Sequence, residues 1–388
     1  MKKLFFCLLL IVVYSQFLSC GEIDKKADTK LIKGIKHVYN TAIPSKGKLT
    51  LNLKKILTIE PGKGEAEIRD LFFYDHVSDQ DGNIYLIDGK SVKIHKFNPR
   101  GKYIKSFLDK GQGPGEFGNY PRVQFSGNIA FISNSNERKI ARYTTDGKFL
   151  KEFKFKKYYY SLHMVDNEKF IGTVNKYLDD KRTKFIKYLG IYTLDEQNPV
   201  KLFEAENAGK FLAYFDNRSI VVIPNPGIYK DVIYTFDSHT KKIYISFNKD
   251  YTIYEKNLKG TTELVIHKDH KNPTLKHSDK VDIVNTFGTM PASLRKAIID
   301  ALPDKMCAIE SLDVLSNGYI LVRSVIGYQK VGFDIFSRRG EYVYLIDLPE
   351  GINLEKIKFS NGVLSGIENR EDTPVYHMYK IESLPNVF

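Results

Sequence analysis

Short apolar runs recur along the chain, and each follows an Asn, Gly or charged residue typical of a tight turn. The first two runs begin at residues 82 and 127, 45 apart, and the last two begin at residues 317 and 361, 44 apart. Periods of about 40–50 residues are typical of four-stranded propeller blades. Six runs follow this pattern and predict six blades: GNIYLID from Gly82, GNIAFIS from Gly127, EKFIGTV from Glu168, NRSIVVI from Asn217, NGYILVR from Asn317 and NGVLSGI from Asn361.

These runs are apolar on both faces, which is typical of fully buried strands. Residues 84–87 read IYLI and residues 319–322 read YILV, with no alternation of polar and apolar positions. A strand of a sheet with one solvated face would alternate, whereas both faces are covered when blades stack front to back. The expected fold is therefore all-β, with each run as the first strand of a blade.

A second hairpin in the repeat supports this interpretation. In residues 97–103, 143–149 and 336–342, an aromatic residue is followed by Gly four positions later and by another aromatic residue six positions later. Glycine supplies the positive φ that such a turn requires. We interpret two further segments as degenerate copies, with an Asp in place of the turn Gly: Tyr192–Asn198 with Asp195, and Tyr234–Lys241 with Asp237.

The repeats predict a six-bladed β-propeller of four-stranded antiparallel blades over residues 49–388. The segment LTLNLKKILTI, residues 49–59, precedes the first repeat and is expected to close the ring by joining the last blade. The fourth and fifth runs begin 100 residues apart, so we expect a partly helical insertion over about residues 250–308, between blades four and five. Within it, residues 291–302 have the apolar spacing of a helix. A seventh, degenerate blade is the alternative.

The first 19 residues have the features of a secretion signal. Two lysines precede an apolar segment, residues 4–13, that is too short to span a bilayer. The sequence LSCG at residues 18–21 resembles a bacterial lipobox, although Phe17 stands where Leu is usual. We expect a lipid on Cys20 and a tether over residues 20–48, so that the protein is anchored in the cell envelope, at the outer membrane. The alternative is an ordinary secretory signal with an unrelated Cys.

Cysteine use agrees with this interpretation. The chain has three cysteines. Cys7 would leave with the signal and Cys20 would carry lipid, so Cys307 has no partner for a disulfide. We expect Cys307 to be a buried free thiol.

The chain is basic, with a formal net charge of +13. Its densest basic stretch, KEFKFKKYYY at residues 151–160, mixes lysines with aromatic residues, a combination that can bind nucleic acid. Because an exported lipoprotein has little access to nucleic acid, we expect no such partner. Anionic surfaces, acidic glycans or solubility explain the charge better.

The densest glycine cluster is GQGPGEF at residues 111–117. A phosphate-binding glycine loop runs from a strand into a helix, whose N-terminus supplies the amides. Here the loop connects two predicted strands, and Pro121 disfavours an immediate helix, so we interpret it as the crossover from blade one to blade two. The expected roles are backbone freedom at Gly111, Gly113 and Gly115, rigidity at Pro114, acceptance of backbone amides at Glu116 and packing between blades at Phe117.

The same stretch carries a family resemblance. GQGPGEF, followed by a Pro and an apolar strand, is similar to the signature of bacterial NHL-repeat-like six-bladed β-propeller lipoproteins. The resemblance covers roughly residues 49–388 and is looser in the later blades. It implies a propeller fold and an envelope location, and it implies no catalytic residue.

Histidines and acids offer weaker candidates. His267, His270 and His277 are near enough in sequence to share a metal ion, with Asp269 and Asp279 beside them. The segment HKDHKNPTLKHSDK is rich in lysine, however, which opposes cation binding, so we interpret it as a solvated loop and expect no cofactor. Two acidic clusters are likewise expected in solvated turns: Asp179-Asp180, and Glu368, Glu371 and Asp372 around Arg370.

Propellers commonly bind ligands where loops converge at the mouth of the central channel. Two function classes follow: a binding or scaffold module for a glycan, peptide or envelope protein, or a propeller enzyme such as a lactonase-like hydrolase or a polysaccharide lyase. The expected mouth residues include Asn and Arg more often than His or Glu, which favours binding. They are Asp88, Asn134, Arg138, Asn175, Arg323 and Asn369.

Overall fold

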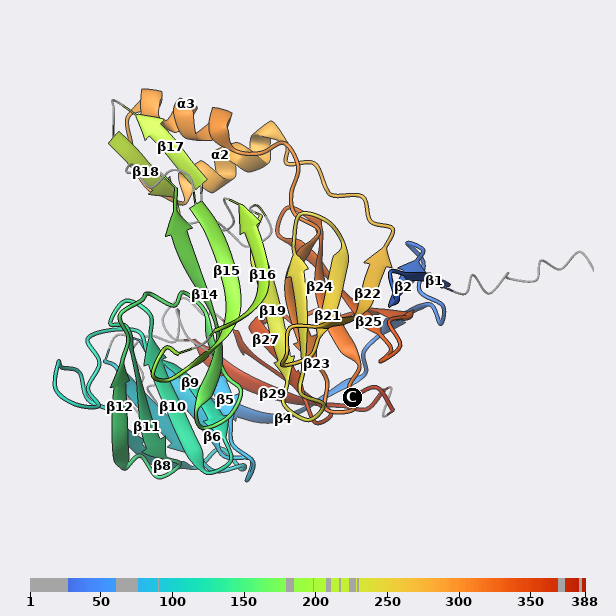
Figure 1. The fold of residues 1–388 in the computed structure, drawn as a ribbon. Coiled ribbons are helices and arrows are strands. Elements are labelled where there is room, and N and C mark those ends of the chain that lie inside the picture. The colour runs from blue at the N-terminus through green and yellow to red at the C-terminus, as the bar shows by residue number, and fades with distance from the viewer. Residues whose placement is uncertain are drawn as a thin grey trace, which may run out of the picture.

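The fold is an all-β propeller with six four-stranded antiparallel blades in a ring (Figure 1). This computed structural model confirms the predicted fold class, and its described part contains two short helices. No helix in that part is long and apolar enough to cross a membrane. The structure describes residues 27–60, 76–89, 91–178, 185–197, 199–206, 211–215, 218–222, 228, 230–368, 374–383 and 386–388.

The strands of each blade are given in order from the innermost to the outermost. Blade one contains β5 (His76–Ser78), β6 (Ile84–Asp88), β7 (Lys93–Phe97) and β8 (Tyr103–Phe107). Blade two contains β9 (Arg122–Ser126), β10 (Ile129–Asn134), β11 (Lys139–Thr144) and β12 (Phe149–Lys154). Blade three contains β13 (Leu162–Met164), β14 (Lys169–Tyr177), β15 (Phe185–Thr193) and β16 (Val200–Glu206).

The second half of the ring repeats this order. Blade four contains β19 (Val232–Asp237), β20 (Lys242–Phe247), β21 (Thr252–Lys256) and β22 (Thr262–Lys268). Blade five contains β23 (Ile309–Val314), β24 (Ile320–Gly327), β25 (Lys330–Phe336) and β26 (Tyr342–Asp347). Blade six contains β27 (Glu355–Ser360), β28 (Val363–Glu368), β29 (Val375–Ile381) and β4 (Leu53–Ile59).

The apolar runs occupy the second strand of a blade, not the first as expected. The run IYLI forms β6, where all five residues of the strand are buried. The strand inside it, β5, has three residues and one of them is exposed. Inner strands line the centre of the ring and mix polar with apolar residues, so they lack the apolar pattern that marks the second strands.

The fourth run was assigned wrongly. The sequence NRSIVVI forms β18 (Arg218–Val222), which pairs with β17 (Phe211–Phe215) in a separate two-stranded sheet. Figure 1 shows this hairpin beside the two helices, away from the blades. The fourth blade begins at Val232, and Tyr234–Lys241 joins its first two strands. Its outer hairpin turns at Gly260, which has a φ of +82°.

The insertion between blades four and five is helical, as expected, but begins later. Its helices are α2 (His277–Asn285) and α3 (Ala292–Ala301), and α3 matches the predicted helix. Residues 252–268, which we expected in the insertion, form the outer strands of blade four. The expected seventh-blade alternative is not observed in the described part of the chain, where the ring has six blades.

The N-terminal strand closes the ring as predicted. Strand β4 pairs antiparallel with β29, from Tyr376 opposite Ile59 to Ile381 opposite Leu53. Figure 1 shows the two strands side by side. Leu57 and Ile59 also pack against apolar residues of blade one, so β4 joins the last blade to the first.

The preceding segment is not a free tether over its described part, which corrects the expectation of a tether over residues 20–48. Strand β1 (Asp28–Ile32) pairs with β2 (Ile35–Asn40), and β2 pairs in parallel with β22 of blade four. Strand β3 (Lys48–Thr50) pairs in parallel with β26 of blade five. These pairings lie outside the repeat, so the repeat pattern does not reveal them. The signal and Cys20 lie outside the described residues.

The glycine turns of the outer hairpins and the buried thiol of Cys307 are observed as predicted. Gly101, Gly147 and Gly340 have φ values of +77°, +77° and +86° in the three outer hairpins. In the degenerate hairpin of blade three, Glu196 takes the positive φ. Cys307 is a buried free cysteine, and burial raises the pKa of its thiol to about 12.

Candidate functional site

The GQGPGEF loop is the crossover from β8 to β9, the strand-to-strand connection that we inferred. The Gly113 amide donates a hydrogen bond of 2.8 Å to the Glu116 carboxylate. Phe117 is fully buried among apolar residues of blades one and two. Gly115 has a φ of +79°, and a Cβ there would lie 2.7 Å from the Tyr143 hydroxyl. Both the backbone shape and the space require glycine at this position.

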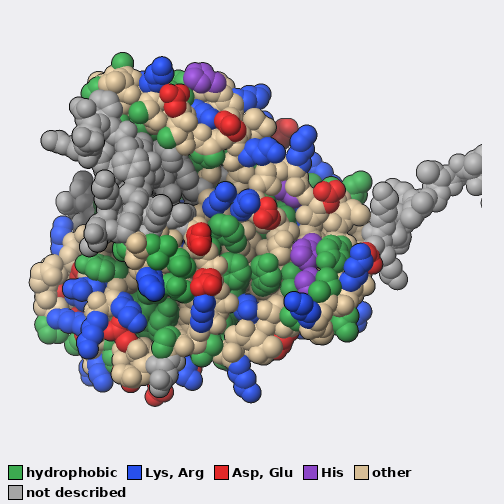
Figure 2. Space-filling view, turned by 45° about the horizontal axis from the view of Figure 1, so that its top comes forward, with side chains coloured by type: hydrophobic (Ala, Val, Ile, Leu, Met, Phe, Trp, Pro, Cys, Tyr) green, Lys and Arg blue, Asp and Glu red, His purple; other side chains and the backbone are tan. Residues whose placement is uncertain are grey.

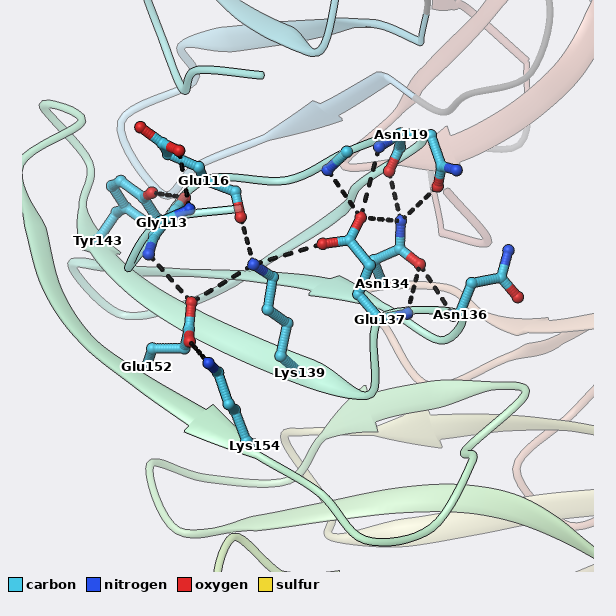
Figure 3. A network of polar contacts seen from close by, with 12 residues as sticks. Gly113, Glu116, Asn119, Asn134, Asn136, Glu137, Lys139, Tyr143, Glu152 and Lys154 are labelled. Atoms are coloured by element: carbon cyan, nitrogen blue, oxygen red, sulfur yellow. Dashed lines mark hydrogen bonds and ion pairs between the residues drawn. The ribbon is translucent and has the colours of Figure 1, made fainter. Parts of the chain in front are cut away.

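A buried lysine, Lys139, connects this crossover to blade two through polar contacts (Figure 3). The Lys139 side chain is nearly inaccessible, and its Nζ lies 3.3 Å from Glu137 and 3.5 Å from Glu152. It also donates to the Glu116 carbonyl oxygen. Glu152 accepts a 3.0 Å hydrogen bond from the Gly115 amide. Two carboxylates thus neutralise the buried ammonium, and the loop is held in one position.

The network continues to the end of the crossover. Glu137 accepts a 2.8 Å hydrogen bond from the Gly118 amide. The Asn134 side chain donates to the Asn119 side-chain oxygen at 2.8 Å and accepts from the Asn136 amide at 2.9 Å. Figure 3 shows Asn134 between the crossover and the loop that follows β10. Asn134 therefore joins two loops on the face of the ring that carries the crossovers.

These loops surround a polar pocket of about 220 Å³, which we call the blade-two pocket. The first crossover, the start of β9, the end of β10 with the turn that follows it, and the next crossover contribute to it. Tyr120 and Tyr160 are 38% and 41% exposed, so part of each side chain reaches solvent at the pocket. The lining residues are Asn119, Tyr120, Arg122, Ser133, Asn134, Ser135, Asn136 and Tyr160.

Two residues of this lining have unusual features. Tyr120 has a backbone φ of +33°, which is strained for a bulky side chain. Arg122 is the charged residue of the lining, and it has no ion pair or side-chain hydrogen bond within the described ranges. Strained backbone conformations cluster at binding and active sites.

Of the predicted mouth residues, the structure places Asn134 in this pocket and Arg138 beside it. Arg138 is exposed, and its guanidinium lies 4.9 Å from the centre of the Tyr158 ring. Asp88 is fully buried and accepts a 3.1 Å hydrogen bond from the Ser91 amide, so it supports a turn.

The other predicted mouth residues do not join them. Asn175 lies within β14, opposite Lys187. Arg323 lies 3.4 Å from Glu310 and faces the ring of Phe333. Asn369 lies outside the described residues, as do Asp179-Asp180, Arg370, Glu371 and Asp372.

The sequence pattern did not indicate the crossover residues Asn119, Tyr120 and Tyr160, nor Arg122 at the start of β9. We expected ligand contacts from loops within blades, whereas three of the eight lining residues lie on connections between blades. Two signals were available in the sequence: the polar residues directly after GQGPGEF, and the tyrosine run that ends at Tyr160.

The inner strands near the channel carry further polar groups. Burial lowers the pKa of His163 on β13 to about 4, and the Lys358 ammonium acts in the same direction. Lys358, on β27 of blade six, donates a 2.9 Å hydrogen bond to the His76 carbonyl of blade one. Burial raises the pKa of the Glu310 carboxyl on β23. The charge of Lys358 in blade six thus lowers the pKa of His163 in blade three, across the ring.

The three histidines proposed for a metal are separated. His267 lies in β22, and its Nε2 is 3.0 Å from Nδ1 of His37 on β2. The His270 ring packs 5.3 Å from Tyr251, and His277 begins α2. The interpretation of residues 267–280 as a solvated loop is therefore wrong at both ends of the segment, which belong to strand β22 and helix α2. No group of three or more potential ligands that could hold a metal occurs among the described residues.

Comparisons with known proteins support the fold. No family model matches the sequence, and no curated protein matches it. A candidate exported protein from Bacteroides fragilis is 13% identical, with a TM-score of 0.54, over 89% of this chain and 100% of that chain. A member of the DUF4221 family from Bacteroides vulgatus is 8% identical, with a TM-score of 0.54, over 86% and 98%.

A third solved structure, streptogramin B lyase, is 14% identical with a TM-score of 0.41, over 85% of this chain and 89% of that chain. That similarity is too low to carry an argument about activity. At these identities the first two neighbours show the propeller fold alone.

Proposed function

We propose that this protein is an envelope-anchored β-propeller lipoprotein that binds a glycan through the blade-two pocket. The observation that supports this is the combination of exposed tyrosine rings with amide and hydroxyl groups in one pocket. Tyrosine offers a flat apolar face with a polar tip, and Asn and Ser side chains both donate and accept hydrogen bonds. Sugars present matching apolar faces and hydroxyl groups.

The ligand claim is tested by removing one ring. Tyr160→Ala is expected to weaken glycan binding by about 1 kcal/mol or more, because the stacking surface is lost. Tyr158→Ala is the matched control: Tyr158 is also exposed, lies two residues away and does not line the pocket. Binding is measured on a glycan array and then by calorimetry with the glycans that bind.

Equal affinity of the Tyr160 and Tyr158 variants would exclude this pocket as the glycan site. Binding of a peptide or an envelope protein instead of any glycan would favour the other partner classes that the fold allows.

The anchoring claim rests on the lipobox-like LSCG sequence, and the exported neighbour from Bacteroides fragilis is consistent with it. Cys20→Ala is expected to move the protein from the membrane fraction to the soluble fraction, since the acylated residue is lost. Cys7→Ala, within the same signal, is the control and is expected to leave the protein in the membrane fraction. Membrane retention of the Cys20 variant would contradict the lipid anchor.

A further inference from the structure

We propose that the glycan bound in the blade-two pocket is acidic, and that Arg122 selects it by pairing with a carboxylate or sulfate group. This inference rests on the proposed function and names the ligand class of the same site. Four observations carry it: the unpaired arginine, its fixed position, the occupied acids around it and the basic groups nearby.

Arg122 differs from the other arginines of the described residues because it lines the blade-two pocket; Arg100, Arg295 and Arg339 also lack a side-chain partner there but do not line it. Arg323 pairs with Glu310, and Arg338 donates to a backbone carbonyl oxygen. Arg122 has no such partner within the described ranges, although it lines a pocket. Its planar guanidinium presents parallel donors that match a carboxylate or a sulfate in a two-point contact. The donors are therefore available to an acidic ligand.

The backbone position of Arg122 is fixed by its neighbours, and its side chain is exposed. It is the first residue of β9, between Pro121 and Val123, which are both buried. Its charge also acts toward the centre of the ring: burial raises the pKa of Tyr234 in blade four to about 12, and Arg122 opposes that rise. The guanidinium thus belongs to the channel mouth rather than to the outer rim.

The acids closest to the pocket are already occupied by the protein. Glu137 accepts the Gly118 amide and pairs with Lys139. Glu196 accepts hydrogen bonds from the Lys156 amide at 2.7 Å and from the Tyr159 hydroxyl at 3.0 Å. Because amides and a buried ammonium bind these carboxylates, they offer little attraction to a ligand cation.

Cations on the same crossovers remain exposed. Arg138 lies beside the pocket, and Lys156 and Lys157 lie on the crossover that carries Tyr160. Deeper in the ring, the Lys358 ammonium contributes to the low pKa of His163. Figure 2 shows lysine and arginine side chains spread over the face of the molecule that it presents, in line with the even charge distribution of the sequence. The local excess of positive charge favours an anionic ligand and speeds its approach.

The test compares matched acidic and neutral saccharides. The wild-type chain is screened on an array of uronic-acid and sulfated oligosaccharides, each printed beside its carboxyl-reduced or desulfated counterpart. Binding is then titrated with wild type, Arg122→Gln and Arg138→Gln. We expect acidic members to bind, and Arg122→Gln to weaken them at least about tenfold while a neutral counterpart is unaffected. Arg138→Gln, an exposed arginine outside the lining, is expected to change the affinity by less than about threefold.

Three results would overturn the inference: equal binding of neutral counterparts, equal losses in the two arginine variants, or no binding of any acidic member. In the first case, a loss of neutral-glycan binding in Tyr160→Ala would leave the proposed function standing while the acidic class fails. Absence of all glycan binding would remove both. Thermal melting of each variant checks folding, and Arg122→Gln is expected to melt like wild type because no group among the described residues loses a hydrogen bond or ion pair.

Discussion

Replacing Asp334 with Asn is expected to lower the free energy of unfolding by about 3–5 kcal/mol, because it leaves a buried ammonium without its counter-ion. Asp334 is fully inaccessible, and its carboxylate lies 2.6 Å from Nζ of Lys268, whose side chain is 7% exposed. It also accepts hydrogen bonds from Tyr251 at 2.5 Å and Tyr342 at 2.6 Å. These contacts join blade four to blade five.

The large expected loss of stability in Asp334→Asn follows from the burial of its ion pair. An exposed ion pair of the same length tests this explanation. Lys48 and Asp347 also lie 2.6 Å apart, but their side chains are 61% and 41% exposed. Asp347→Asn is expected to cost no more than about 1 kcal/mol, because water screens that pair. Both variants are compared with wild type by urea denaturation.

A second substitution separates lost charge pairing from lost packing. Adding Lys268→Met to Asp334→Asn removes the unpaired ammonium, so part of the stability is expected to return. Equal losses for Asp334→Asn and Asp347→Asn, or no recovery in the double variant, would show that the buried pair does not stabilise the junction between these blades.

The repeat pattern predicted the blades wherever their second strands are continuous apolar runs. It failed in blade four because the hairpin β17–β18 carries such a run, whereas β19 and β20 are joined by an Asp turn without Gly. Strands β1–β3 were missed for another reason. The partners of β2 and β3, which are β22 and β26, lie more than 200 residues away in sequence, and this parallel edge pairing leaves no local periodicity; among the described strands, β1 pairs only with β2.

The candidate site was predicted only in part. Asn134 was found because it follows an apolar strand, where polar residues mark a loop. Arg122 begins β9 of blade two and Tyr160 lies on the crossover to blade three, so they line one pocket only when these blades stand next to each other in the ring. A pattern within one repeat cannot show a site that forms between repeats.

The ring is expected to depend on β4 more than on any strand before it. A chain that begins at residue 61 lacks the outer strand of blade six, so the edge of β29 and the apolar residues beneath it become exposed. Gly101 of blade one also loses Leu57, which packs directly against it. Because β4 joins the two ends of the ring, we expect this chain to lose its cooperative thermal transition.

A chain that begins at residue 48 keeps β3 and β4 and is the control. It lacks β1 and β2, whose pairing adds an edge to blade four and is not part of the ring closure. We expect it to melt cooperatively, within a few degrees of the mature protein. Circular dichroism and calorimetry measure both chains.

A rearranged chain tests whether ring closure requires only the presence of β4 or also its position before blade one in the chain. Leu53 lies opposite Ile381 in the antiparallel ladder, so β4 begins where β29 ends. Residues 48–60 placed after Phe388 through a Gly/Ser linker can therefore form the same pairing as a hairpin. We expect this chain, starting at residue 61, to regain the cooperative transition. If the chain that simply lacks residues 1–60 melts like the mature protein, closure by β4 does not hold the ring together, and the stacking of adjacent blades is sufficient.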